Sequence, residues 1–463
     1  MKSLIKKLIP KFLLQWYHKG LAYLGAFIYG NPSEKMIVIG VTGTNGKSTT
    51  VSLIAKALEA GGDKVGALST VMFKVAGEEE LNDKKMTMLG RFQLQKYLKR
   101  MVDAGCKYAV VETSSQGVEQ YRHIAINYDY AVFTNLTPEH IEAHGGFNNY
   151  KEAKGKFFEH LNKKRTKRLR DLENKKIGKQ KNNIPLCHPE LVSGSAADKE
   201  VKKTIVVNAD DEHADYFLSF AADKKVTFSV KRKAEFMASN IKVTVKGTSF
   251  DYNQIAINLK LIGAFNVENA LPAIVIAQNE GIEIEKIKTA LESVMVIPGR
   301  TEMISQGQNF FVMVDYAPEP GSMKKLYETL DQIKGSDFPY KKLIHVLGSC
   351  GGGRDKARRP ILGQMAGRKA DLVFVTNEDP YDEDPMSIIT EVSRGAKEVG
   401  KQEGKDLFLI LDRKEAIKKA LESAQENDLV LITGKGSERA MAVAGGIYIK
   451  WDDREVVREL LRK

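Results

Sequence analysis

The sequence GTNGKS at residues 43–48 has the residue types of a loop that binds phosphate groups. Glycines permit a tight turn, and the backbone N–H groups of such a turn at the start of a helix bind phosphate oxygens. The Lys47 ammonium would reach the β- and γ-phosphates of ATP, and the Ser48 hydroxyl would hold Mg²⁺. Val41 stands where the strict form of this motif has its first glycine, so the segment is a shorter relative of that motif.

Two further polar clusters each follow an apolar run in the first half of the chain. The sequence ETSS occupies residues 112–115, and NLTPEH occupies residues 135–140. Proteins of the α/β class bind ligands beyond the carboxyl ends of parallel strands. Mg²⁺ prefers carboxylate ligands, so Glu112 is a candidate ligand, although such a cluster can also cap a helix. A second histidine, His144, follows the Glu139-His140 pair and favours a functional site over a structural one.

These clusters need a parallel sheet to bring them together, and the sequence predicts two such sheets. Residues 36–41 form a continuous apolar run, as in a buried parallel strand, and residues 49–60 have helical periodicity with Gly61 as a C-cap. Further strands are expected at 108–111, 130–134 and 204–207, and in a second unit at 311–314, 343–347, 372–375, 407–411 and 429–432. The expected fold class is α/β: a P-loop-type central ATPase domain at 36–297, and a C-terminal doubly wound, Rossmann-like domain at 298–463.

The charge pattern argues against a nucleic-acid-binding protein. The chain has 463 residues and a net charge of +12, of which residues 1–35 contribute +5 and residues 161–203 contribute +8. The remaining, folded part is close to neutral, so no nucleic acid is expected as a partner. Cys106, Cys187 and Cys350 have no metal-type spacing and indicate a reducing, cytoplasmic location.

The two basic segments have separate interpretations. Residues 1–35 are amphipathic, with Lys6, Lys7 and Lys11 beside aromatic residues, and contain no apolar run of the about 20 residues that a membrane span needs. They fit either a helix packed on the next domain or a helix lying on an anionic membrane surface. Residues 161–203 combine a Lys/Arg run with Asn, Pro and Gly, and are expected to form an inserted, largely disordered loop without function.

Several motifs in one order resemble those of the Mur ligases, and more narrowly the E type of that family. The resemblance covers residues 36–463 apart from the insertion. Its motifs are GTNGKS at 43–48, ETSS at 112–115, NLTPEH at 135–140, GAFNVEN at 263–269, PGRTE at 298–302, DYA at 315–317, GGGRDK at 351–356 with Arg359-Pro360, and GKG at 434–436 with Glu438.

The resemblance implies an ATP site and a metal site. The implied ATP contacts are Gly43, Thr44, Asn45, Gly46, Lys47, Ser48, Thr49, Asn135, Asn266 and Asp315. The implied metal ligands are Ser48, Glu112, His140 and Lys154. Lys154 would act as a carbamylated lysine, whose oxygens can bind Mg²⁺. The implied catalytic residues are Lys47, Lys154 and Arg300. Without the resemblance, Lys154 fits a solvated lysine on a helix.

The same resemblance implies the substrates and their contacts. ATP would phosphorylate the D-glutamate carboxylate of a UDP-muramoyl dipeptide, and the amine of L-lysine or meso-diaminopimelate would attack the acyl phosphate. The chain is expected to act as a monomer in the cytoplasm, with membrane contact through residues 1–35 as an added possibility. The implied substrate residues are Thr87, Ser114, Ser115, Arg122, Arg354, Asp379, Tyr381, Gly434 and Glu438.

The chain departs from the family pattern at several positions. Gln116, Pro318 and Ser437 each stand where the family has a histidine, and Tyr381 stands where diaminopimelate-adding members have an arginine. Residues 1–35 are too few to replace the family's N-terminal domain, which grips the uridine nucleotide. Two alternatives therefore stay open: a related ligase of the folylpolyglutamate or cyanophycin type, or a nucleotide-binding interaction protein recruited to the membrane.

Overall fold

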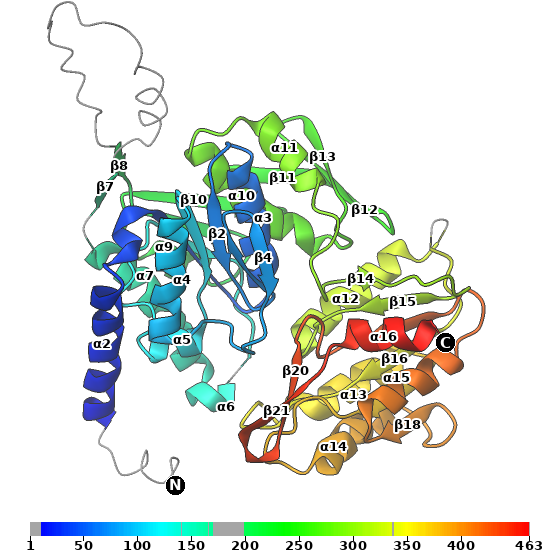
Figure 1. The fold of residues 1–463 in the computed structure, drawn as a ribbon. Helices are drawn as coiled ribbons and strands as arrows, with labels where there is room; N and C mark the ends of the chain where they lie inside the picture. The colour runs from blue at the N-terminus through cyan, green and yellow to red at the C-terminus, as the bar shows by residue number, and fades with distance from the viewer. Residues whose placement is uncertain (1–10, 140, 165, 170–198, 336–337, 463) are drawn as a thin grey trace, which may run out of the picture.

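A computed structural model describes residues 11–139, 141–164, 166–169, 199–335 and 338–462 (Figure 1). It contains two α/β units that lie side by side. The first is blue to green in Figure 1, and the second is yellow to red. The expected α/β class, with two separate sheets, is confirmed.

The first unit is built on an 11-stranded sheet in the order β13-β12-β11-β10-β9-β6-β1-β5-β2-β3-β4. Its centre is parallel, and antiparallel strands extend both edges. The parallel strands have apolar runs and are buried, as expected where helices cover both faces. The strands are β1 (Ile37–Thr42), β2 (Val65–Leu68), β3 (Met72–Val75), β4 (Glu78–Leu81), β5 (Tyr108–Glu112), β6 (Tyr130–Phe133), β9 (Thr204–Asn208), β10 (Lys224–Ser229), β11 (Phe236–Thr244), β12 (Gly247–Tyr252) and β13 (Ile255–Leu259).

Two hydrophobic cores lie on opposite faces of this sheet. On one face α3 (Lys47–Glu59), α10 (Phe265–Asn279) and α11 (Ile284–Glu292) pack together. On the other face lie α4 (Arg91–Asp103), α5 (Ser115–Glu119), α7 (Phe147–Lys163) and α9 (Ala214–Leu218). The loops that follow β1, β5 and β6 therefore meet at one edge, where the predicted motifs were expected to gather.

The second unit has a six-stranded sheet in the order β14-β15-β19-β16-β17-β18. Only β14 runs antiparallel. The strands are β14 (Glu302–Met303), β15 (Phe311–Val314), β16 (Leu343–Leu347), β17 (Leu372–Thr376), β18 (Leu407–Ile410) and β19 (Leu429–Ile432). Helices α12 (Pro320–Ile333), α13 (Arg358–Lys369) and α14 (Pro385–Glu398) cover one face, and α15 (Arg413–Glu422) and α16 (Asp453–Leu461) cover the other. A hairpin of β20 (Ala440–Val443) and β21 (Ile447–Lys450) projects from this unit.

The expectation of a largely disordered loop at 161–203 is wrong at both ends. Residues 161–163 complete α7, and β7 (Lys167–Leu169) pairs antiparallel with β8 (Lys199–Val201). The Lys167 and Lys203 ammonium groups are buried and bond to the two oxygens of the Asp129 carboxylate, at 2.5 and 3.0 Å. These two lysines are part of the fold, and their pairing with the buried Asp129 carboxylate holds the two ends of this segment on the first unit. Residues 170–198 lie outside the described residues.

The chain enters the first unit through helix α2 (Lys11–Ile28) and a short 3₁₀ helix at Pro32–Lys35. Helix α2 packs beside α4, as one of the two readings of this segment expected. A further short helix, α6 (Ile141–His144), precedes α7. In the described part of the chain, no helix combines the length and the apolarity that crossing a bilayer requires.

Candidate active site between the two α/β units

The loop between β1 and α3 has the backbone that its glycines predict. Gly43 has φ of 153° and Gly46 has φ of 80°, the latter in the left-handed region that favours glycine. A Cβ on Gly46 would lie 2.1 Å from Oδ1 of Asn269, so only glycine fits there. The Lys47 ammonium folds back to donate to the Thr44 carbonyl at 2.7 Å. The loop therefore has the backbone geometry of an anion-binding turn at the start of α3.

Glu112 stands at the end of β5, next to the loop, because β5 pairs directly with β1. The Ser48 hydroxyl donates to Oε2 of Glu112 at 2.8 Å. The backbone N–H and hydroxyl of Thr70 also donate to this carboxylate, at 2.7 and 3.0 Å. A hydroxyl and a carboxylate held together beside a phosphate-binding loop form a donor set of hard oxygen atoms that fits Mg²⁺.

Lys154 lies beneath the loop and not in solvent. Its side chain, on α7, is buried, and its Nζ donates to the Gly43 carbonyl at 2.7 Å. Burial, and then the charge of Lys47, lower the pKa of Lys154 well below its usual value. Burial therefore disfavours the charged form of this amine, and the solvated helical lysine suggested by the sequence alone is wrong.

The predicted substrate residues of the first unit line a hollow on the other side of Lys47. Ser114 caps α5 by accepting a bond from the Gly117 N–H at 3.1 Å. The Ser115 hydroxyl pairs with Nε2 of His144 at 3.1 Å. Arg122 donates to the Gln120 side chain at 2.7 Å, and burial lowers the pKa of Arg122 to about 10. Thr87, Ser114, Ser115, Arg122, Lys154 and Arg354 all line this hollow.

The second unit closes the cleft from the side opposite the loop. Asp315, at the end of β15, accepts bonds from the backbone N–H groups of Thr301 at 2.7 Å and Ala317 at 2.9 Å. Burial raises the pKa of Asp315, and Arg300 opposes that shift. The Asn45 amide donates to Oε1 of Glu319 across the cleft at 2.6 Å. The phosphate-binding loop thus contacts the second unit directly.

Charged groups from both units meet at the far end of the cleft. The buried Lys435 ammonium lies 3.0 Å from both oxygens of Asp379 and 2.6 Å from Glu438. Lys85, from the first unit, also bonds to Asp379, and donates to the Ala440 carbonyl at 3.2 Å. Burial alone would raise the pKa of Asp379, but Lys435 and Lys85 hold it below its usual value. This end is an ion network that spans the two units.

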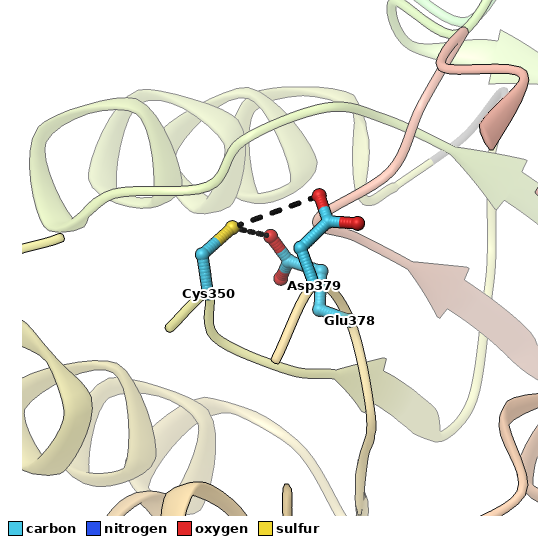
Figure 2. Close-up of side chains that lie close together, drawn as sticks. All are labelled: Cys350, Glu378 and Asp379. Carbon is cyan, nitrogen blue, oxygen red and sulfur yellow. Dashed lines mark hydrogen bonds between the residues drawn. The ribbon is translucent and has the colours of Figure 1, made fainter. Parts of the chain in front are cut away.

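Figure 2 shows Cys350 beside Glu378 and Asp379 in this network. Their ligand-type atoms lie within 4.8 Å of one another. The thiol donates to Oε1 of Glu378 at 2.7 Å, and burial raises the pKa of both groups. Because Asp379 already bonds to two lysines, the group is better described as part of the ion network than as a metal centre.

The structure brings most of the predicted site residues into one cleft. It is lined by Thr44, Asn45, Gly46, Lys47, Ser48, Thr49, Thr87, Glu112, Asn135, Arg300, Asp315, Arg354, Asp379, Tyr381 and Glu438. Gly43 lines the adjoining hollow. Asn266 and Gly434 do not line either space: the Asn266 side chain bonds to Asn269, which does line the cleft, and Gly434 packs against Glu378. His140 lies outside the described residues.

Sequence reasoning did not assign several residues of this cleft. Thr70 and Lys85 lie in loops without a motif, and only the tertiary contacts with Glu112 and Asp379 reveal them. Asn269 was present in the sequence GAFNVEN, but one sequence does not show which asparagine faces the cleft. Glu319 follows the DYA motif at 315–317, and its contact with the loop requires closure of the two units.

Comparison with known proteins identifies the family. The model of the Mur ligase middle domain matches residues 41–184 and 179–277, and that of the Mur ligase glutamate ligase domain matches residues 299–436. A UDP-N-acetylmuramyl-tripeptide synthetase of Roseiflexus sp. (strain RS-1) is 37% identical, over 95% of this chain and 81% of that protein. A UDP-N-acetylmuramoyl-L-alanyl-D-glutamate–2,6-diaminopimelate ligase of Geobacillus kaustophilus (strain HTA426) is 34% identical, over 98% of this chain and 85% of that protein.

Solved structures agree with this result. The structure of a UDP-N-acetylmuramoyl-L-alanyl-D-glutamate–2,6-diaminopimelate ligase has a TM-score of 0.56 and 28% identity, over 92% of this chain and 78% of that chain. Folylpolyglutamate synthase of Mycobacterium tuberculosis has a TM-score of 0.63 at 16% identity, over 90% and 92% of the two chains, which shows a shared fold alone. The chain belongs to the Mur ligase family.

Proposed function

We propose that this chain is an ATP-dependent ligase that joins a diamino acid, L-lysine or meso-diaminopimelate, to UDP-N-acetylmuramoyl-L-alanyl-D-glutamate, with release of ADP and phosphate. One observation carries this proposal: the phosphate-binding loop and Glu112 face, across a single cleft, the charged network around Asp379. An ATP site and a site for a charged amino acid thus share one cavity. The relative that is 34% identical is named a UDP-N-acetylmuramoyl-L-alanyl-D-glutamate–2,6-diaminopimelate ligase, and the one that is 37% identical a UDP-N-acetylmuramyl-tripeptide synthetase, which supports the proposal.

The first half of the reaction would use the residues around the loop. The backbone of residues 43–48 and the Lys47 ammonium would bind the ATP phosphates. Ser48 and Glu112 would hold Mg²⁺, which offsets phosphate charge when it is bound. Arg300 would reach the transferred phosphate from the second unit, because its guanidinium lies in the same cleft, stacked 4.5 Å from the Tyr316 ring centre. The D-glutamate carboxylate would become an acyl phosphate.

Lys154 would supply a negative group at this position as a carbamate. In its deprotonated form the amine can attack the carbon of CO₂: an N–C bond forms, one C–O π bond breaks and one N–H proton is released, so that the amine becomes a carboxylate-like anion. Burial supports this step because it lowers the pKa of Lys154 and so disfavours the protonated, unreactive form of the nitrogen. The Gly43 carbonyl would still accept the remaining N–H.

The second half would place the amino acid at the ion network. Tyr381 lines the cleft there and has φ of 53°, and it can donate one neutral hydrogen bond. Diaminopimelate carries one carboxylate more than lysine, and an arginine side chain would bind that carboxylate through two parallel hydrogen bonds. We therefore propose that the chain prefers a diamino acid with one carboxylate, such as L-lysine.

The alternatives fit less well. A folylpolyglutamate-type activity rests on a 16% identical structure, which shows the fold alone. A non-catalytic nucleotide-binding protein would not need the Ser48–Glu112 contact or a buried Lys154 beneath the loop. Because residues of one chain complete the cleft, we propose a monomer, and because the substrates are ATP and a nucleotide-linked precursor, we propose a cytoplasmic enzyme.

A substrate panel tests the proposal. Phosphate release is measured with ATP, Mg²⁺, L-lysine or meso-diaminopimelate, and either UDP-N-acetylmuramoyl-L-alanyl-D-glutamate, folate or an aspartate polymer. The proposal expects release only with the muramoyl dipeptide. Release with folate or the aspartate polymer alone would assign the chain to another branch of the superfamily. No release with any acceptor would favour the non-catalytic alternative.

A further inference from the structure

Helix α2 is amphipathic, but its small residues face the protein and its large apolar residues face solvent. The side that faces the protein is made of small residues: Ala22, Gly25 and Ala26 are buried, against α4 and Ala125. A Cβ on Gly25 would lie 3.6 Å from the Phe92 ring, so the helix packs closely through this side. Figure 1 shows α2 on the outside of the first unit, away from the second unit.

The large apolar side chains of α2 point to solvent. Trp16 is 74% exposed and Phe27 is 76% exposed. A spacing of three and four residues places these side chains on one stripe of the helix. The stripe consists of Leu13, Trp16, Tyr17, Tyr23, Leu24, Phe27 and Ile28. Single exposed apolar residues are ordinary, whereas a continuous stripe of seven marks a surface that another apolar phase covers.

Charge identifies that phase. The sequence before Glu34 contains five lysines and no acidic residue. Lys19 flanks the stripe, with its ammonium 4.9 Å from the Tyr121 ring centre. Lys164, at the end of α7, lies 5.5 Å from the Tyr23 ring centre. Cations beside an apolar face that is rich in Trp and Tyr are typical of helices that lie in the headgroup region of an anionic bilayer.

We propose that the exposed stripe of α2 docks the protein on the surface of an anionic membrane, with the helix axis parallel to the bilayer. A second copy of the chain fits less well, because pairing two stripes would bring Lys19 and Lys164 of both copies together without a carboxylate of α2 between them. None of the stripe residues lines the cleft or the adjoining hollow. The inference rests on α2 and the cations beside it, and it does not depend on the proposed ligase reaction.

Co-sedimentation of the full chain with vesicles tests this inference. The wild type is expected to sediment with phosphatidylglycerol–phosphatidylcholine vesicles, to bind pure phosphatidylcholine at least tenfold more weakly, and to dissociate as NaCl is added. The double variant Trp16→Ser/Phe27→Ser should lose at least tenfold in binding, since both side chains are exposed and outside the core. Met295→Ser is the matched control, because Met295 is also exposed but lies far from α2 in the sequence.

Three results would overturn the inference. The first is an absence of wild-type binding to anionic vesicles. The second is equal binding by the double variant when its circular dichroism and melting temperature match the wild type. The third is a wild-type dimer in sedimentation velocity that the double variant abolishes without vesicles, because a second copy would then occupy the stripe. Ligase activity without vesicles should be the same in both proteins.

Discussion

Replacing Lys154 tests the least expected feature of the cleft, a buried amine beneath the phosphate-binding loop. Lys154→Met keeps most of the side-chain volume but cannot form a carbamate. It leaves the Gly43 carbonyl without its 2.7 Å donor, which costs about 1–3 kcal/mol of folding free energy. Loss of one preorganised charged group from an active site costs about 10²–10³ in kcat, or roughly 2.7–4 kcal/mol. We expect kcat to fall by that factor while ATP binding is retained.

The assay couples ADP release to a spectrophotometric readout, with ATP binding measured by calorimetry. Lys154→Ala, which leaves a space at the site, should regain part of its activity with formate or acetate, because a small carboxylate can take the place of the carbamate. Lys156→Ala on the same helix is the control, since Lys156 is exposed and should behave as the wild type. Wild-type turnover by Lys154→Ala in CO₂-depleted buffer would refute the reasoning.

Three further predictions concern other parts of the cleft. Gly46→Ala should weaken ATP binding by about ten- to a hundredfold in calorimetry, because its Cβ would lie 2.1 Å from Asn269, whereas Gly90→Ala, in open space, should not. Burial, then Glu139, raises the pKa of Glu319 to about 7 from 4.5, so the folded chain binds this proton more tightly than the unfolded chain. Stability without nucleotide should therefore fall as pH rises from about 4.5 to 7 and level off above pH 7. Glu319→Gln should remove this component of the pH dependence of Tm, and a variant with the wild-type pH profile would contradict the assignment to Glu319. Tyr381→Arg should raise the kcat/KM ratio of meso-diaminopimelate to L-lysine by about ten- to a hundredfold. An unchanged ratio would show that the second carboxylate of the amino acid does not bind beside residue 381.

The sequence predicted those features that depend on residues close together in the chain. The glycines and Lys47 of the loop follow an apolar strand and precede a helix, and that context alone predicts a phosphate-binding turn. All five strands expected in the second unit are present, because each is a buried apolar run between helical segments.

Features that depend on tertiary burial could not be predicted. In sequence, Lys154 fits a solvated lysine and Lys167 belongs to a segment expected to be disordered, yet one lies under Gly43 and the other bonds to Asp129. Lys85 belongs to no motif, and its role follows only from the closure of the two units on Asp379. In α2 the spacing showed amphipathicity, but not that the small residues face the protein.

The central claim is that one cleft activates a carboxylate with ATP and passes it to an amine. The most direct measurement uses UDP-N-acetylmuramoyl-L-alanyl-D-glutamate labelled with ¹⁸O in the γ-carboxylate, together with ATP, Mg²⁺ and L-lysine. Mass spectrometry of the products should show tripeptide, ADP and phosphate in equal amounts, with one ¹⁸O atom transferred from the carboxylate to the phosphate. Phosphate without ¹⁸O, or ATP hydrolysis without tripeptide for every diamino acid supplied, would contradict the account.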